Sequence, residues 1–128
     1  MSSVIFFIQD DKDSLINDII VWENTLNMMD IKDFTFVDMD NLHPGNPNAV
    51  KTFWEALQRH PGIKVHVKQT GDIALEHYVH PDNACYIFGP DSGKLEIDFG
   101  LSIRLECEEV WAYTAASIVL YDKKTKLK

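Results

Sequence analysis

The stretch "YIFGPDSGKL", residues 86–95, joins an apolar segment to a loop that leaves its backbone accessible. Gly89 has no side chain to keep a ligand from the main chain, Pro90 stiffens the turn, and Ser92-Gly93 lets it reverse sharply. Bare amide and carbonyl groups of this kind can bind a small ligand in an apolar slot. Without a second signal, the same glycines also fit an ordinary tight turn.

A second group with chemical potential lies in "FVDMDNLHPG", where Asp38 and Asp40 follow an apolar segment. An Asp-x-Asp of this kind resembles haloacid-dehalogenase-like phosphatases, in which the acids work around Mg²⁺. That pattern has Thr two residues after the second Asp, where this chain has Leu42, and its strand is normally the first of the fold. The two acids are therefore expected to be a strand-end and a loop residue, with the phosphatase as a remote alternative.

The histidines do not form a metal pattern. His77 and His80 could share one helix face, but no third ligand follows at the spacing that a metal site needs. The sequence predicts surface histidines here and no metal.

The elements that must position these residues alternate between strands and helices. Continuous apolar runs predict strands at 4–8, 34–38, 84–88 and 101–107. The alternation over 63–68 in "IKVHVKQ" predicts a further strand that has one polar face or lies near an edge of the sheet. Helical spacing predicts helices over 15–29, over 47–60 with Pro47 near the first position, over 72–78, and over 111–124. Trp22, Phe53 and Trp54 lie on helical stripes and are expected in the core. This order indicates a single-domain α/β fold over residues 1–128 with a mainly parallel sheet, whose ligands bind beyond the carboxyl ends of strands.

The length of the chain and its cysteine content limit the kinds of protein that it can be. The 128 residues suffice for one core, and the apolar run at 4–8 is too short for a signal peptide or a membrane span. The two cysteines, Cys85 and Cys107, lie in strand-like runs and are expected to be buried free thiols, so a reducing cytoplasm is the default location.

The charge is unevenly distributed. The net charge is −8, and residues 1–42 carry nine acids against Lys12 and Lys32. A basic tail at 123–128 holds Lys123, Lys124, Lys126 and Lys128. The overall field disfavours tight RNA binding unless a partner assists.

Two segments together resemble a known family. "IFGPDSGKL" resembles the second motif of the SpoU-like branch of SPOUT methyltransferases, usually Phe-Gly-Pro-Glu before a small loop and Gly-Leu. "IRLECEEVWAYTAASIVLYDKK" resembles the third motif, an Ile-Arg-Ile-Pro-like strand leading through a loop into a helix. The resemblance covers residues 65–124 in sequence and the N-terminal half in element order.

The resemblance implies an α/β fold with a C-terminal trefoil knot and S-adenosylmethionine (SAM) held in the knot by backbone groups. Carried over residue by residue, it implies cofactor contacts at Val67, Gly89, Leu105 and Ala112. It also implies a homodimer formed partly by the last helix, and activity as an RNA ribose 2′-O-methyltransferase.

The sequence departs from the family where catalysis is expected. The first loop, "QDDKDSLIND", has neither the glycine nor the arginine of the family, and Lys12 is its only basic side chain. Lys12 is the nearest basic catalytic candidate, although a lysine among aspartates is more simply a solvated charge. The third-motif asparagine falls at Trp111, which would either fill the cofactor site or stack on a ring.

Two functional hypotheses follow from these residues. One is a SAM-dependent RNA methyltransferase with degenerate motifs, and the other is a non-catalytic SPOUT-fold interaction module with or without the cofactor.

Overall fold

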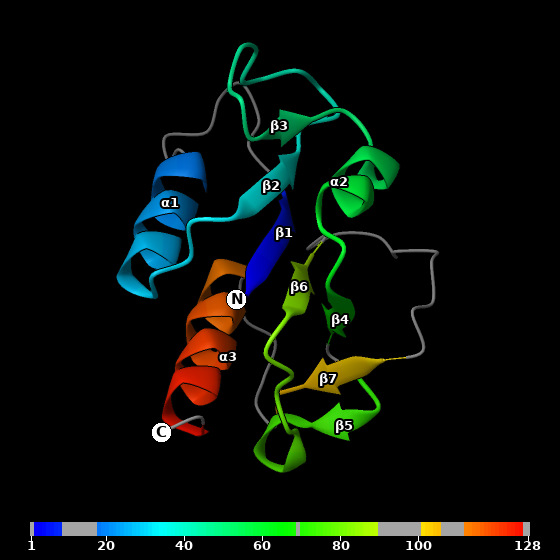
Figure 1. The fold of residues 1–128 in the computed structure, drawn as a ribbon. Helices are drawn as coiled ribbons and strands as arrows, with labels where there is room; N and C mark the ends of the chain where they lie inside the picture. Colours follow the sequence, from blue (N-terminus) through cyan, green and yellow to red (C-terminus); the bar gives the residue numbers. More distant parts are fainter. Residues whose placement is uncertain (1, 9–17, 69, 90–100, 106–111, 127–128) are drawn as a thin grey trace.

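Seven strands and three α-helices form one α/β domain in the described part of the chain (Figure 1). The computed structural model describes residues 2–8, 18–68, 70–89, 101–105 and 112–126. The elements in chain order are β1 (Ser3–Phe7), α1 (Asp18–Met28), β2 (Phe34–Val37), β3 (Ala49–Val50), α2 (Phe53–Arg59), β4 (Ile63–Val67), β5 (Ile73–Ala74), the 3₁₀ helix η1 (Leu75–His77), β6 (Ala84–Phe88), β7 (Ser102–Arg104) and α3 (Ala112–Lys126).

All the strands run parallel in one sheet, in the order β3-β2-β1-β6-β4-β7-β5. β6 lies between β1 and β4, where every one of its residues is buried. This burial on both faces explains why β1 and β6 read as continuous apolar runs rather than as alternating patterns. The predicted α/β class and parallel sheet are confirmed, and the sheet contains no antiparallel pair among the residues described.

Helices cover the sheet from two sides, which gives two cores. On one side α1 and α3 pack over alternate residues of the central strands, including Phe6, Val65 and Phe88. On the other side α2 packs over a smaller cluster that includes Ile5, Val37 and Ile87. Figure 1 shows α1 and α3 together on one side of the sheet and α2 on the other. The domain therefore has three layers.

α2 begins later than the sequence predicts, and Pro47 is not in its first turn. Thr52 is the N-cap, and its Oγ1 accepts a hydrogen bond from the Glu55 amide at 3.2 Å. The preceding Val50 belongs to β3, which pairs with β2 and extends the sheet by one edge strand. The Thr-x-x-Glu pattern at 52–55 is a sequence signature of a helix N-terminus, and it is the signal that locates the true start of the helix.

The buried face of α2 also differs from the predicted stripe, with Ala56 as its buried residue. Trp54 is 65% exposed, so the prediction that it lies in the core is wrong. Phe53 is half-buried and stacks obliquely on Phe7, with ring centroids 5.4 Å apart. Trp22 is 1% exposed, as predicted.

Other predicted elements differ from the structure in extent. The segment predicted as a helix at 72–78 is the short strand β5 followed by η1. β4 alternates as predicted in its centre, with Val65 and Val67 in the core, but Ile63 is 45% exposed and His66 is buried. β4 is an interior strand, because β7 and β5 extend the sheet beyond it.

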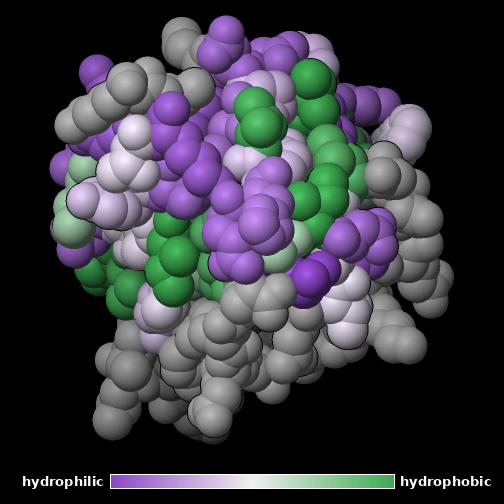
Figure 2. Space-filling model, turned by 90° about the horizontal axis from the view of Figure 1, so that it is seen from below, coloured by the Kyte–Doolittle hydropathy of each residue, from purple (hydrophilic) through white to green (hydrophobic). Residues whose placement is uncertain are grey.

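The surface at the end formed by β5, η1 and the last turns of α3 is mixed in character. Figure 2 views the molecule from this end and shows mostly hydrophilic side chains with smaller hydrophobic groups among them. None of the helices in the described ranges is both long enough and apolar enough to cross a bilayer. Two α3 side chains, Ile118 and Tyr121, are 40% and 60% exposed.

Candidate ligand site at the carboxyl ends of β4, β6 and β7

Three of the four predicted cofactor-contacting residues lie along one edge of the sheet. Val67 is the last residue of β4, Gly89 follows β6 directly, and Leu105 follows β7 directly. The strand order places β4 between β6 and β7, and Val67 is in register with Phe88 on one side and Ile103 on the other. Residues that are far apart in the sequence therefore meet at the carboxyl ends of three neighbouring strands.

The fourth predicted residue, Ala112, is the first residue of α3. α3 then runs back along the sheet, so that Lys126 near its end reaches the carbonyl oxygens of Leu75 and Tyr78 at 2.6 and 3.0 Å. Tyr113 in the first turn of α3 packs against Trp22, which in turn packs against Phe88, the last residue of β6, so this turn lies toward the carboxyl end of β6. The backbone at Ala112 thus belongs to the same end of the molecule as the three strand-end residues.

The strand order creates a topological switch point at this edge. β1 and β6 are neighbours, but the chain leaves β1 for β2 on one side and leaves β6 for β7 on the other. Connections that diverge from adjacent parallel strands form a topological switch point, where α/β proteins bind ligands. Gly89 lies at this switch point.

Gly89 has the backbone conformation that the sequence suggested for a bare loop. Its φ angle is +91°, which favours glycine over residues with a side chain. The carbonyl oxygen of Gly89 lies 3.4 Å from Nε2 of His66, which can donate a long hydrogen bond to it. Burial lowers the pKa of His66, and the bond to Gly89 opposes that shift in part. The His66 ring, whose neutral form is favoured, is therefore positioned to donate a hydrogen bond to the Gly89 carbonyl directly after β6.

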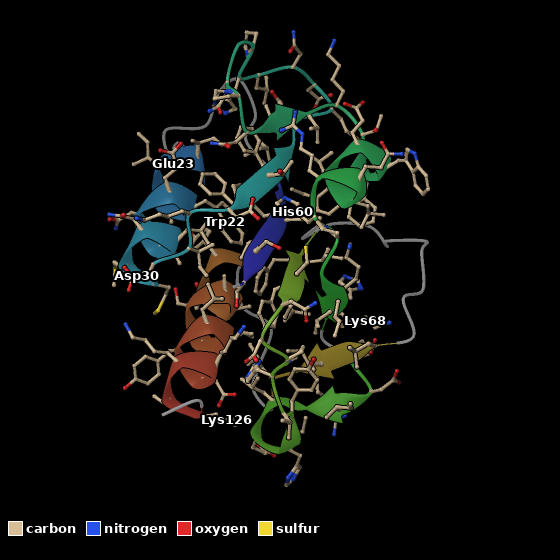
Figure 3. All side chains as sticks on the ribbon, in the orientation of Figure 1. Trp22, Glu23, Asp30, His60, Lys68 and Lys126 are labelled. Carbon is tan, nitrogen blue, oxygen red and sulfur yellow. The ribbon has the colours of Figure 1, made fainter. Side chains whose placement is uncertain are left out.

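An aromatic group lies under this edge on the α1 and α3 side. The Trp22 ring is 5.8 Å from the Phe88 ring and meets the Tyr113 ring edge-on at 6.4 Å. Figure 3 shows Trp22 between α1 and the sheet. Val67 and Leu105 pack against the same core. Among the described residues, the floor of the site is thus apolar.

Several predicted residues lie outside the described residues. These are the catalytic candidate Lys12 with the aspartates around it, the loop residues Pro90 to Gly93, Cys107, and Trp111. Cys85 is described, and it is a buried free thiol as predicted.

Asp38 has a structural role in the turn after β2. It is buried, and its two carboxylate oxygens accept hydrogen bonds from the amides of Leu42 and His43 at 2.9 and 2.8 Å. These bonds close the turn in which Asn41 adopts a φ of +54°. Asp40 is exposed. In the parts of the chain that the structure describes, no three His, Cys, Asp or Glu residues are grouped to hold a metal ion.

The two histidines expected on the surface differ. The side chain of His77 is 79% exposed, as predicted, but that of His80 is completely buried, so the surface prediction is wrong for His80. His80 is bonded to Tyr86 at 2.6 Å and to Asp122 at 2.7 Å. Asp122 is 42 residues away in the sequence, and no local pattern around His80 indicates it.

Much of the basic tail is built into the fold. Lys123 is buried and donates to the Pro81 carbonyl at 3.0 Å, and Lys126 forms an ion pair with Asp122 at 2.9 Å. Lys124 lies 3.9 Å from Asp30. The described tail lysines thus secure α3 rather than forming a free cationic arm.

Neither a scan against protein-family models nor a search of curated proteins finds a match to this chain.

Proposed function

We propose that this chain is a SPOUT-fold protein that binds SAM at the carboxyl ends of β4, β6 and β7, and that its catalytic motifs are degenerate. The proposal includes the knotted C-terminal path, the homodimer and the cytoplasmic location expected from the sequence. It combines the family resemblance of residues 65–124 with the geometry of the candidate site.

One observation carries the proposal. Val67, Gly89 and Leu105 were assigned to one ligand from three separate segments, and the fold brings these segments together on adjacent strands. A merely local turn at Gly89 would not require the other two residues to be its neighbours. The apolar floor and the glycine at a positive φ suit an adenosine-containing ligand that is held by backbone groups.

The chemistry favours a binding module over an efficient enzyme. Ribose methylation requires the 2′-hydroxyl to be positioned and its proton or developing charge to be accepted. The first loop supplies three aspartates and Lys12 but no arginine. We therefore propose cofactor binding as the main function. Methyl transfer to RNA would require a partner that supplies the missing arginine or an equivalent group.

Calorimetric titration with SAM and with S-adenosylhomocysteine tests the proposal. Wild-type protein should bind at least one of them, and Gly89→Val should not, because a branched side chain would occupy the space where ligand meets backbone. Gly45→Val is the matched control, since Gly45 also has a positive φ, of +84°, but lies in the loop between β2 and β3. A Cβ added at Gly45 would meet no atom of the described residues within 4 Å.

Both glycine variants carry the same kind of backbone strain, so thermal unfolding of each shows whether the fold survives. Loss of binding in Gly89→Val with binding retained in Gly45→Val supports the site. If neither SAM nor S-adenosylhomocysteine binds to the folded wild-type protein, the cofactor proposal is refuted. Unchanged affinity in Gly89→Val would show that the cofactor binds at another site.

A further inference from the structure

β2 has an open edge at its first residue, Phe34. The neighbouring edge strand β3 is short and pairs only with Phe36 and Val37 in the second half of β2. Phe34 pairs with Val4 of β1 on its inner side, and no strand among the described residues lies opposite it on its outer side. The outer edge of β2 is therefore covered near its carboxyl end and uncovered at its start.

The main-chain groups of Phe34 point out of the sheet at this edge. The amides of Phe36 and Asp38 donate to carbonyls of the β3 segment at 2.9 and 2.7 Å, so the even-numbered residues of β2 direct their main-chain groups away from β1. The odd-numbered residues point toward β1, as the Val37 carbonyl accepts from the amide of Ile8 at 3.1 Å. By this alternation the amide and the carbonyl of Phe34 face the open edge. No described residue forms a hydrogen bond with either group.

The chain that leads into β3 does not close this edge. Nη1 of Arg59, the last residue of α2, donates to the Pro47 carbonyl at 3.0 Å. The segment before β3 is therefore drawn toward α2, whereas α1 packs on the opposite face of the sheet. On the α1 side, the described chain leaves the space beside Phe34 unfilled.

A groove of about 520 Å³ occupies this space. Its walls come from α1, from the segment between α1 and β2, and from Phe34 itself (Figure 1). Ile20, Ile31 and Phe34 line it with apolar groups, and Asn24 and Asn27 line it with amides. Ile20 is 64% exposed although it is apolar. An apolar hollow thus adjoins two main-chain groups that have no partner in the described chain.

Acidic side chains predominate around the groove. Glu23 lines it, and Asp30 and Asp33 are exposed on the segment that leads to β2, against the single cation Lys32. Lys124 approaches Asp30 at 3.9 Å, which leaves Glu23 as the acid in the groove itself. Complementarity of charge therefore favours a basic ligand over an acidic one.

We propose that the open edge of β2 binds an extended, basic peptide segment of a partner protein by strand addition. The amide and the carbonyl of Phe34 pair with the main chain of the added strand, which continues the line of β3. One apolar side chain of the segment lies in the groove against Ile20 and Ile31, and a basic side chain two residues away on the same face reaches Glu23. A ligand without a peptide backbone would not use the paired donor and acceptor of Phe34, so the edge selects a peptide.

This surface includes no residue of the candidate cofactor site, and the inference does not depend on the proposed function. Phe34 is at the amino end of β2, whereas the candidate site lies at the carboxyl ends of β4, β6 and β7. The outcome of the SAM titrations therefore leaves the peptide surface unaffected.

The test is a titration of ¹⁵N-labelled protein with the peptide acetyl-Lys-Thr-Val-Thr-Lys-amide, followed by two-dimensional NMR. The valine and both lysines of this peptide lie on one face of an extended strand. One control peptide carries Glu in place of both lysines. A second control is N-methylated at its three central residues, which keeps the side chains but removes main-chain donors.

Ile20→Asn and Met28→Asn are the matched variants of the protein. Both side chains belong to α1 and are 64% and 66% exposed, but only Ile20 lines the groove. The NMR spectrum of each variant shows directly whether it is folded.

The basic peptide should shift the amide resonance of Phe34 downfield, because that amide gains a hydrogen bond, and should shift the inward-pointing amide of Thr35 less. Ile20→Asn should weaken the binding about threefold or more, since an apolar contact is lost, and Met28→Asn should leave it unchanged. No shift at Phe34 with about 5 mM peptide would overturn the inference. Equal binding of either control peptide, or equal effects of the two variants, would overturn it as well.

Discussion

His80 donates a hydrogen bond from Nε2 to the Asp122 carboxylate at 2.7 Å, which ties the segment before β6 to α3. Its other ring nitrogen, Nδ1, accepts from the Tyr86 hydroxyl at 2.6 Å. Lys126 completes the group through its ion pair with Asp122 at 2.9 Å. Burial by itself would raise the pKa of Asp122, but the hydrogen bonds from His80 and Lys126 together outweigh it, so the pKa is lowered. This partly buried chain of bonds secures the helix whose first turn borders the candidate site.

The first prediction concerns the stability of this network. Tyr86→Phe should reduce the free energy of unfolding by about 1–3 kcal/mol, because it leaves Nδ1 of buried His80 without a partner. Thr70→Val is the control, because it also removes one hydroxyl but at an exposed position outside α3, and it should change stability by less than about 0.5 kcal/mol. Urea unfolding followed by circular dichroism measures both. Equal stability of the two variants would show that the Tyr86 hydroxyl contributes nothing.

The second prediction is that the protein loses stability as the pH falls below about 6.5. Burial is the main cause that lowers the pKa of His60, His66 and His80, so the folded state favours their neutral forms. As the pH falls, the histidines of the unfolded chain bind protons first, near their ordinary pKa of 6.5, whereas those of the folded chain bind protons only at lower pH. The neutral buried histidines therefore contribute their full stability above pH 6.5, and this contribution is lost as the pH falls through the folded pKa values. Each histidine contributes at most about 1.4 kcal/mol per pH unit.

Urea unfolding between about pH 8 and pH 5 measures this dependence. For His80, the charged groups that face it are Asp122, Lys126 and Lys123, and the two lysines reinforce the preference for the neutral ring. His66→Gln should flatten the curve, whereas His77→Gln, at an exposed position, should not. Stability that stays constant or rises toward pH 5 would contradict the assignment of neutral buried histidines.

The third prediction concerns the homodimer. Ile118 and Tyr121 on α3 are substantially exposed and apolar, and we expect a second copy of the chain to cover them. Ile118→Glu should shift the protein from dimer to monomer in light scattering at micromolar concentration. Val79→Glu is the control, because Val79 is 85% exposed but lies outside α3. A monomeric wild-type protein would remove the dimer from the proposal.

The fourth prediction separates an enzyme from a binding module. We expect the purified protein alone to transfer no methyl group from radiolabelled SAM to total RNA, because its first loop lacks the arginine that the resembling enzymes use. Robust incorporation that is lost in Lys12→Ala or Asp10→Ala would instead make that loop catalytic. Incorporation that appears only with cell extract would indicate a partner that completes the site.

The amino-acid sequence by itself determined the class of the fold and most of its elements. The apolar run of β6 and the alternation of Val65 and Val67 identify strands locally. A strand buried on both faces has a continuous run of apolar residues, and a strand buried on one face has an apolar residue at every second position. Gly89 could also be singled out from sequence, since few residues other than glycine adopt its backbone conformation easily. The sequence did not determine the start of α2. Val50 and Trp54 both fit the apolar stripe of the predicted helix, but Val50 lies in β3 and Trp54 is exposed to solvent.

Only the tertiary structure decided which strands are neighbours and which polar groups meet. Strand order arises from crossovers that no local pattern encodes, and it is this order that places Val67 beside both Phe88 and Ile103. The same holds for His80, whose burial depends on Tyr86 and on Asp122, 42 residues away. A polar residue is buried where the fold supplies hydrogen-bond partners, and long-range partners are fixed only when the sheet and α3 have packed together.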